Sequence, residues 1–278
     1  MKKISRRSFM AAAAVSVAAL ALTACGGSAS SAASSVASSA ASSEAASSAA
    51  AAELTTVEAG KLTMATNAAF PPYEMTTDAG EFEGIDVDTA KAIAEKLGLE
   101  LQIDDMDFDA ALLSVQQGKA DIVMAGVTVT DERKAVMDFS DSYATGIQSI
   151  IVPEGSDITS PDDLAGKKIG TQRGTTGYIY CSDDFGDDAV VAYDDGLTAV
   201  QALNNGQVDA VVIDNAPAKE FVAANPGLVI LDTSYAEEDY AIGMAKGSSL
   251  EDVVNAALEE LKADGTLQSI VDKYITAE

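Results

Sequence analysis

Histidine is absent from the 278 residues of this chain. Its absence excludes Ser-His-Asp and Cys-His catalytic arrangements, together with every metal site built on imidazole ligands. We therefore expect no catalytic residue, no metal and no cofactor.

Positive charge and cysteine are both scarce. The chain has 17 lysines and arginines against 44 aspartates and glutamates, and its formal net charge is −27. Such a surface repels nucleic acid and anionic lipid headgroups, so we expect no nucleic-acid partner. The two cysteines are Cys25 and Cys181, and if Cys25 is modified as argued below, no disulfide framework remains. Apolar residues make up 47% of the chain, which is ample for the core of one large domain or two modest ones.

Long hydrophobic runs are also missing. The apolar run from Met10 to Leu22 is too short to be a comfortable membrane span, and it follows a basic start. The next residues complete the tetrad Leu22-Thr23-Ala24-Cys25, which resembles the lipobox of bacterial lipoproteins. The resemblance implies that residues 1–24 are a signal peptide and that Cys25 is acylated after cleavage. Ser5-Arg6-Arg7-Ser8-Phe9 also resembles a twin-arginine signal, so both export routes stay open.

Residues 26–52 are almost entirely serine and alanine, with Glu44 as their single charge. Such a segment has no large apolar residue and cannot build a core. We expect residues 25–53 to be a flexible tether. With the acylated cysteine, it predicts an extracytoplasmic protein that is anchored to the cell membrane by lipid.

Two stretches of the remaining chain, 113–124 and 201–212, repeat one pattern. Each reads as a helix that ends at a glycine, followed by a short turn, an aspartate and a buried strand. Each half also carries two further strand-like runs, which are Lys61 to Ala65 and Leu99 to Ile103 in the first half and Lys167 to Gly170 and Ala189 to Tyr193 in the second. Strands that alternate with helices indicate parallel α/β sheets, so the repeat predicts two similar α/β lobes.

The end of the chain predicts two helices, Ser249 to Ala263 and Leu267 to Ile275, of which the first has an apolar stripe typical of core packing. We expect these helices to return to the first lobe. The predicted domains are lobe 1 over 54–143 plus 241–278, lobe 2 over 149–235, and a two-strand hinge at 144–148 and 236–240.

Arg133 follows a predicted strand end at Gly126. Thr130, which precedes two acids, predicts a helix N-cap and places Arg133 one turn into the helix, pointing back towards that glycine. Such an arginine can form a fork with a small carboxylate. The alternative is an ordinary surface arginine that pairs with a nearby acid. Arg133 and Arg173 are the only arginines after residue 24, and Arg173 is expected at the lip of the site.

Open α/β sheets bind ligands beyond the carboxyl ends of their strands. Two such edges that face each other would close on one small molecule. The strand-end positions that we expect to line this site are Asn67, Phe70, Phe108, Gly126, Thr128 and Arg133 in lobe 1, and Gln172, Thr175, Thr176 and Asp214 in lobe 2.

Several motifs carry a family resemblance. They are Ala69-Phe70-Pro71-Pro72-Tyr73-Glu74, Gly84-Ile85-Asp86-Val87-Asp88 and Thr130-Asp131-Glu132-Arg133-Lys134. Over about residues 54 to 275 the chain closely resembles the polar amino-acid binding proteins of bacterial ABC importers, known as solute-binding protein family 3. The resemblance implies a two-lobed Venus-flytrap fold of the periplasmic-binding-protein-like type II. It also implies a monomer that presents its closed form to the transmembrane subunits of an ABC permease.

The resemblance also implies roles for individual residues. Arg133 would hold the ligand α-carboxylate, helped by the hydroxyl or backbone of Thr128 and by the backbone N–H of Thr176. Asp214 and the Gly126 carbonyl would take the α-ammonium group. The alternative for Asp214 is a helix N-cap, and both roles can hold at once because the carboxylate has two oxygens.

The side-chain end of the ligand would lie between Phe70 and Phe108, which would sandwich it by stacking. The alternative is that both rings are simply core. Asn67 stands where basic-amino-acid binders of the family carry an aspartate, so the site loses a negative charge. With Gln172 and Ile213 nearby, this predicts a neutral polar ligand such as glutamine or cystine.

Two other functional classes remain open at this point. Cyclohexadienyl or arogenate dehydratases share the fold, and an enzyme of that kind would need a general acid, for which Glu74 and Asp214 are the candidates. The sensor domain of a signalling receptor would need a transmembrane helix or a cytoplasmic module after residue 278, and we expect neither.

Overall fold

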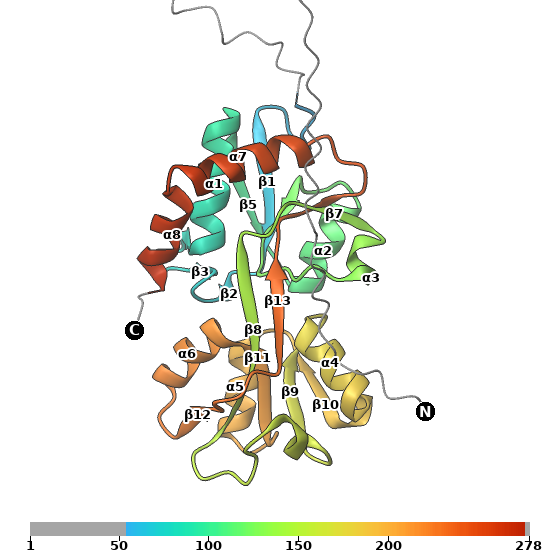
Figure 1. Cartoon of the computed structure of the whole chain (residues 1–278), viewed down its shortest axis with the longest axis vertical. Coiled ribbons are helices and arrows are strands. Elements are labelled where there is room, and N and C mark those ends of the chain that lie inside the picture. Colours follow the sequence, from blue (N-terminus) through green and yellow to red (C-terminus); the bar gives the residue numbers. More distant parts are fainter. Residues whose placement is uncertain (1–53, 276–278) are drawn as a thin grey trace, which may run out of the picture. The chain divides into compact units, whose positions relative to one another are not determined.

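The computed structural model describes residues 54–275 (Figure 1). The predicted signal peptide, the tether and Cys25 lie outside the described residues. Within them, no helix combines the length and the apolar character that a membrane crossing needs.

Lobe 1 is built on a five-stranded sheet with the order β5-β1-β6-β14-β7. β1 is parallel to both β5 and β6, whereas β14 runs antiparallel to β6 and β7. A second, three-stranded sheet contains β2, β3 and β4 in that order. The strands of the two sheets are β1 (Lys61–Thr66), β2 (Ala69–Phe70), β3 (Glu74–Thr76), β4 (Phe82–Glu83), β5 (Glu100–Asp105), β6 (Ile122–Val123), β7 (Met137–Phe139) and β14 (Gly243–Ala245).

The C-terminal helices of the described chain pack on lobe 1. The fully buried Leu258 of α7 belongs to the same core cluster as Met64 of β1 and Ile93 of α1, and Figure 1 shows α7 and α8 beside α1. The chain therefore passes from lobe 1 into lobe 2 and then returns to lobe 1. The helices of lobe 1 are α1 (Ile85–Leu97), α2 (Phe108–Gln116), α3 (Asp131–Lys134), α7 (Glu251–Ala263) and α8 (Thr266–Tyr274).

Lobe 2 is built on a six-stranded sheet with the order β10-β9-β11-β8-β12, in which β13 also pairs with β8. β9 is parallel to β10 and β11, and β8 is antiparallel to its neighbours. The strands are β8 (Ala144–Pro153), β9 (Ile169–Gln172), β10 (Val190–Tyr193), β11 (Ala210–Asp214), β12 (Leu228–Ile230) and β13 (Ala236–Tyr240). The helices are α4 (Thr176–Phe185), α5 (Gly196–Asn204) and α6 (Asn215–Ala224), with 3₁₀ turns at Pro161–Leu164 and Asp187–Ala189.

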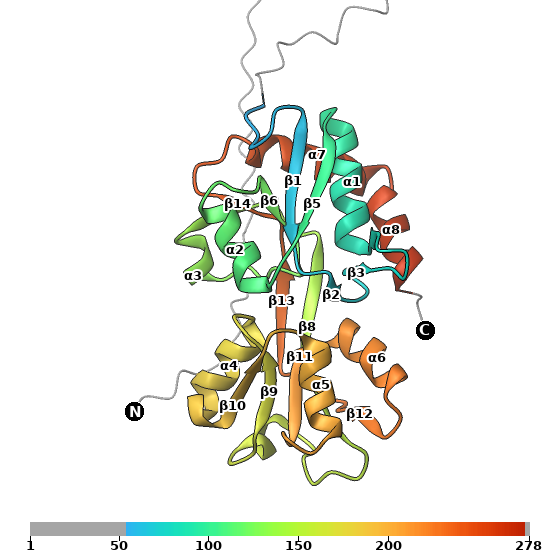
Figure 2. The same cartoon turned by 180° about the vertical axis from the view of Figure 1, so that it is seen from behind.

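Two strands connect the lobes. β8 and β13 pair in antiparallel register from Ala144 opposite Tyr240 to Gln148 opposite Ala236. Both views show this pair running between the two lobes (Figures 1 and 2). The described residues thus form two α/β lobes, each with a mixed but parallel-rich sheet, joined by two strands. This is the fold class that the sequence predicts.

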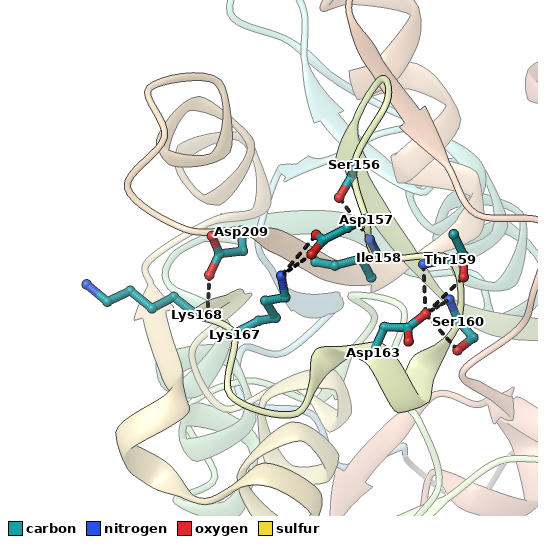
Figure 3. Close-up of polar contacts among 9 residues, drawn as sticks. All are labelled: Ser156, Asp157, Ile158, Thr159, Ser160, Asp163, Lys167, Lys168 and Asp209. Atoms are coloured by element: carbon teal, nitrogen blue, oxygen red, sulfur yellow. Dashed lines mark hydrogen bonds and ion pairs between the residues drawn. The ribbon is translucent and has the colours of Figure 1, made fainter.

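The repeated aspartates do the same work in both lobes. Asp121 accepts a hydrogen bond at 2.8 Å from the backbone N–H of Thr63 in β1, and Asp209 accepts one at 2.7 Å from the N–H of Lys168 just before β9. Figure 3 shows the second contact, beside the ion pair between Asp157 and Lys167. Each aspartate therefore ties the turn after a helix to a parallel strand of its lobe, β1 or β9, which gives the repeat a structural reason.

Some element boundaries differ from the predicted ones. The strand predicted over Lys167 to Gly170 is Ile169–Gln172, because Asp209 takes the N–H of Lys168. The helix predicted from Ser249 begins at Glu251, after an N-cap at Leu250. These shifts of two residues leave the alternation of strands and helices unchanged.

Candidate functional site

A cavity of about 440 Å³, including the open space at its mouth, is lined by residues of both lobes. All ten residues that the sequence places in the site line it. The others are Glu74, Ala125, Gln148, Val212, Ile213 and Tyr240. The cavity lies where β1 and β6 of lobe 1 and β9 and β11 of lobe 2 end, as the positional argument from open α/β sheets requires.

Arg133 is buried at the wall of this cavity. Thr130 caps α3 by accepting a hydrogen bond from the Arg133 N–H at 3.2 Å, and this cap starts the turn that carries the guanidinium inward. Nη1 donates to the Thr128 carbonyl at 2.8 Å, and Nη2 donates to the Gly174 carbonyl of lobe 2 at 3.1 Å. The guanidinium carbon also lies 5.4 Å from the centre of the Phe108 ring.

The alternative of a surface arginine is wrong, because the Arg133 side chain is 8% exposed and forms no ion pair with an acid among residues 54–275. Burial lowers the pKa of the guanidinium, and the negative charge of Glu238 opposes that effect. An arginine has five N–H donors, and only two are used here. The remaining donors have no partner among residues 54–275 and could bind a small anion.

The start of α4 faces the same cavity. The Thr175 side chain caps this helix by accepting a hydrogen bond from the Tyr178 N–H at 3.3 Å. The first N–H groups of a helix have no partner inside the helix and carry its positive dipole end. Thr175 and Thr176 both line the cavity, so the helix start adds to the positive field of Arg133.

Asp214 has the capping role that the sequence offered as an alternative. Its Oδ1 accepts from the Ala216 N–H at 3.0 Å at the start of α6, and its Oδ2 accepts from the Ile147 N–H at 2.7 Å in β8. Burial raises the pKa of Asp214 to about 6, against the opposing effect of these two hydrogen bonds. Tyr240 also forms a side-chain hydrogen bond with Asp214. Since a carboxylate has about four lone-pair sites, one site remains for contact with a ligand.

Gly126 is fixed by a second buried acid. Its N–H donates to Asp86 Oδ2 at 3.0 Å, and Tyr143 donates its hydroxyl to Asp86 Oδ1 at 2.7 Å. Gly126 has a φ of 54°, and a Cβ there would lie 2.9 Å from the Phe70 ring. A side chain is therefore excluded at Gly126 both by backbone strain and by contact with the ring.

The two phenylalanines line the cavity and also pack against apolar clusters. Phe70 is half-buried, stacks on Tyr73 with 5.8 Å between ring centres, and contacts apolar clusters of both lobes. Phe108 is a member of the cluster that contains Ala65 and Val123. Both rings thus have core contacts in addition to a face on the cavity.

Asn67 and Gln172 join the lobes across the cavity. Gln172 Nε2 donates to Asn67 Oδ1 at 2.8 Å, and Asn67 Nδ2 donates to the Met106 carbonyl at 3.0 Å. The pair already satisfies much of its own hydrogen-bonding capacity, which leaves less for a ligand amide than the sequence suggests.

Glu74 lines the cavity, although the sequence did not predict it among the ligand-binding residues. Its side chain is 1% exposed, and its carboxyl group lies beside the buried carboxyl group of Asp86, with which it interacts through a side-chain hydrogen bond. Burial, followed by the charge of Asp86, raises the pKa of Glu74 well above its ordinary value. The sequence named Glu74 only as a candidate general acid, because nothing in the motif reveals that the side chain lines the cavity.

Glu238 was missed entirely, since it lies in the run Glu237-Glu238-Asp239, which looks like a solvated acidic stretch. In β13 the burial alternates, so Glu238 is buried between two exposed acids. Among residues 54–275 no group of histidine, cysteine, aspartate and glutamate side chains is arranged to hold a metal ion.

Comparison with known proteins gives one consistent result. Residues 62–277 match the family of bacterial extracellular solute-binding proteins, family 3. The chain is 33% identical to a probable histidine-binding protein of Neisseria gonorrhoeae, over 96% of this chain and 95% of that one. It is 32% identical to the L-cystine-binding protein TcyJ of Escherichia coli K12, over 80% and 85% of the two chains. An ancestral arginine-binding protein bound to glutamine has a TM-score of 0.75 and 42% identity, with 78% of this chain and 99% of that chain covered.

Proposed function

The chain belongs to the bacterial extracellular solute-binding proteins of family 3, so it is an amino-acid-binding protein of an ABC importer and not an enzyme. We propose that its ligand is an amino acid whose side chain ends in N–H donors. Arginine is the first candidate and glutamine the second. The dehydratase alternative is set aside with the enzyme class.

The observation that supports this proposal most is the buried Glu74 carboxyl group in the wall of the cavity. A buried carboxyl group whose neighbour is a second buried acid is costly to ionise, and a ligand that donates N–H groups to it lowers that cost. A guanidinium group matches a carboxylate with two parallel hydrogen bonds, whereas an amide offers a single donor group. If Glu74 ionises when a guanidinium group binds, it supplies the negative charge whose loss at Asn67 led the sequence to predict a neutral ligand.

The remaining contacts of the ligand follow from the cavity wall. We propose that Arg133 and the start of α4 hold the α-carboxylate, that Asp214 and the Gly126 carbonyl hold the α-ammonium group, and that Phe70 and Phe108 flank the side chain. Positive and negative groups at opposite ends of one cavity fit a zwitterion. Asn67 and Gln172 are proposed to close the cavity over it.

The relatives support an amino acid without deciding which one, since their names state histidine, cystine and arginine, and one structure holds glutamine. Proton release separates the two candidates. Bound arginine would require ionised Glu74, so its binding would release a proton, whereas glutamine can bind to the protonated form.

Isothermal titration calorimetry tests the proposal on the full chain with arginine, glutamine, histidine and cystine. Each titration is run at pH 6 in two buffers that differ in their heat of ionisation. We expect both heats to depend on the buffer, because either α-ammonium group favours ionised Asp214, whose pKa is about 6. The arginine heat should depend on the buffer more steeply, because only arginine also requires ionised Glu74. If no amino acid binds better than millimolar, the proposed ligand class is wrong.

We also propose that the protein is a lipoprotein, held at the outer side of the cell membrane by acylated Cys25 and spaced from it by the tether. The lipobox-like tetrad supports this proposal, and two or more acyl chains give stable anchoring. Metabolic labelling with a radioactive fatty acid should mark the wild-type chain and not the Cys25→Ser variant. Equal labelling of both would contradict it.

A further inference from the structure

Glu238 lies behind the wall of the cavity, in the middle of β13. Its side chain is 7% exposed, and it is paired in register with Gly146 of β8. It does not line the cavity, but Thr128, Gln148 and Thr176, which do line it, all contact Glu238. A carboxylate in such a position is expensive to bury, so the contacts that hold it matter for the conformation.

Three donors converge on one oxygen of this carboxylate. Thr128 donates its hydroxyl to Oε2 at 3.1 Å, Thr176 donates its hydroxyl at 2.9 Å, and Gln148 donates Nε2–H at 3.0 Å. Thr128 belongs to lobe 1, Thr176 begins α4 of lobe 2, and Gln148 lies in the connecting strand β8. A single atom therefore joins both lobes and the strands between them.

This convergence depends on how the lobes are arranged. The two threonine hydroxyl oxygens are 3.4 Å apart. Two donors can share one acceptor atom only while they lie within about 6 Å of each other, which is twice the length of a hydrogen bond. A hinge rotation that separates Thr128 from Thr176 by more than that must break at least one of the bonds to Glu238. The carboxylate would then stay in the protein with fewer donors.

We propose that Glu238 is a latch, a positioning residue in the hinge that stabilises the closed arrangement of the two lobes before any ligand is bound. It acts through Thr128 and Thr176 and does not touch the ligand. Hydrogen bonds to a charged acceptor are stronger than those between neutral groups, so the negative charge of Glu238 contributes to the effect.

The latch has a consequence for affinity, and this part of the inference rests on the proposed function. The apparent affinity for a ligand between the lobes is the intrinsic affinity multiplied by the fraction of protein in the closed, binding-competent state. By raising the closed fraction, Glu238 strengthens the binding of every ligand by the same factor. A residue that touches the ligand would instead change the order in which ligands are preferred.

The first test needs no ligand. A ketone-bearing amino acid is placed at Leu113 in α2 and at Ile179 in α4, which are both exposed, and the distance between attached spin labels is measured by pulsed electron paramagnetic resonance on the full chain. We expect Glu238→Met, which lacks the acceptor oxygens, to shift the distribution to longer distances. Glu238→Gln keeps one oxygen but not the charge, and should lie between this variant and the wild type.

Glu237→Gln is the matched control, because it removes the same charge from the exposed neighbour on β13. It should leave the distance distribution as in the wild type. If Glu238→Met leaves the distribution unchanged, or if Glu237→Gln shifts it equally, the latch does not exist. Should Glu238→Met fail to fold, the comparison of Glu238→Gln with Glu237→Gln decides in the same way.

The second test uses calorimetry with arginine and glutamine. Glu238→Gln should weaken both by the same factor, about tenfold if the charged character of the hydrogen bonds is lost. A reversal of the ligand preference would show direct contact and contradict the latch. If the wild type binds neither amino acid, the proposed function fails, but the distance measurement still decides whether Glu238 holds the lobes together.

Discussion

Gly174 of lobe 2 lies directly against Asp109 of lobe 1, so closely that a Cβ on Gly174 would overlap the Asp109 carboxylate. The Gly174 carbonyl also accepts the hydrogen bond from Arg133. The two lobes therefore touch at Gly174. Gly174 also has a φ of 73°, a backbone conformation that favours glycine.

Gly174→Ala should weaken ligand binding severalfold, because the added methyl group fits only if the exposed Asp109 carboxylate rotates away or the lobes stay further apart. Calorimetry with arginine and glutamine provides the measurement. The control is Gly206→Ala, which imposes the same backbone strain at a φ of 66° but meets no atom within 4 Å. Equal weakening by both variants would show that strain, rather than the contact with Asp109, is responsible.

Arg133→Ala should cost about 2 to 5 kcal/mol of binding free energy, as expected when a desolvated charge pair loses one partner. The fold should remain intact, because the Arg133 guanidinium only bonds to two backbone carbonyls. Arg173→Ala is the control, since its side chain is 56% exposed and pairs with exposed Asp194. If Arg133→Ala binds the amino acid as tightly as Arg173→Ala does, Arg133 does not hold the ligand α-carboxylate.

Asp214→Ala tests the opposite end of the proposed ligand. It should weaken binding by a similar amount, and it should also lower the stability of the free protein by about 1 kcal/mol, because α6 loses its N-cap. Asp195→Ala is a matched control, as Asp195 caps α5 in the same lobe and does not line the cavity. If both variants lose only stability, Asp214 does not contact the ligand.

The stability of the ligand-free protein should depend on pH through Glu74. The folded protein has a raised Glu74 pKa, so between the ordinary value of 4.5 and the raised value the folded state binds more protons than the unfolded state. The free energy of unfolding therefore falls as pH rises above 4.5, by up to about 1.4 kcal/mol per pH unit for this group.

Glu74→Gln should remove that part of the slope, because a glutamine side chain carries no titrating proton. Urea unfolding between pH 4.5 and 6.5 measures the slope, with Glu81→Gln as an exposed control in the same region. A slope that is identical in wild type and Glu74→Gln would mean that Glu74 ionises normally in the folded protein.

The sequence predicts much of the fold because its signals are local. The repeated pattern of helix, glycine, aspartate and strand has a direct structural counterpart in Asp121 and Asp209, each of which bonds to the start of a neighbouring strand. The Thr130 cap likewise follows from sequence alone and places Arg133 correctly on its helix. Strand-end positions then bring all ten predicted residues to one cavity.

The two acids that sequence reasoning undervalued depend on contacts between distant parts of the chain. Glu74 is buried by the packing of β3, and its raised pKa comes from burial and from Asp86, Asp105 and Asp214, which no sequence pattern connects to it. Glu238 differs from Glu237 and Asp239 only in the face of β13 on which it stands. A one-residue shift of the strand register would have exposed it, so its burial cannot be derived without the pairing of β13 with β8.

A crystal structure of the protein grown with arginine tests the central claim most directly. We predict one arginine in the cavity between the lobes, with its α-carboxylate on the Arg133 guanidinium and its side-chain N–H groups within hydrogen-bonding distance of Glu74. An arginine bound elsewhere, or bound in the cavity with its guanidinium away from Glu74, would contradict the account.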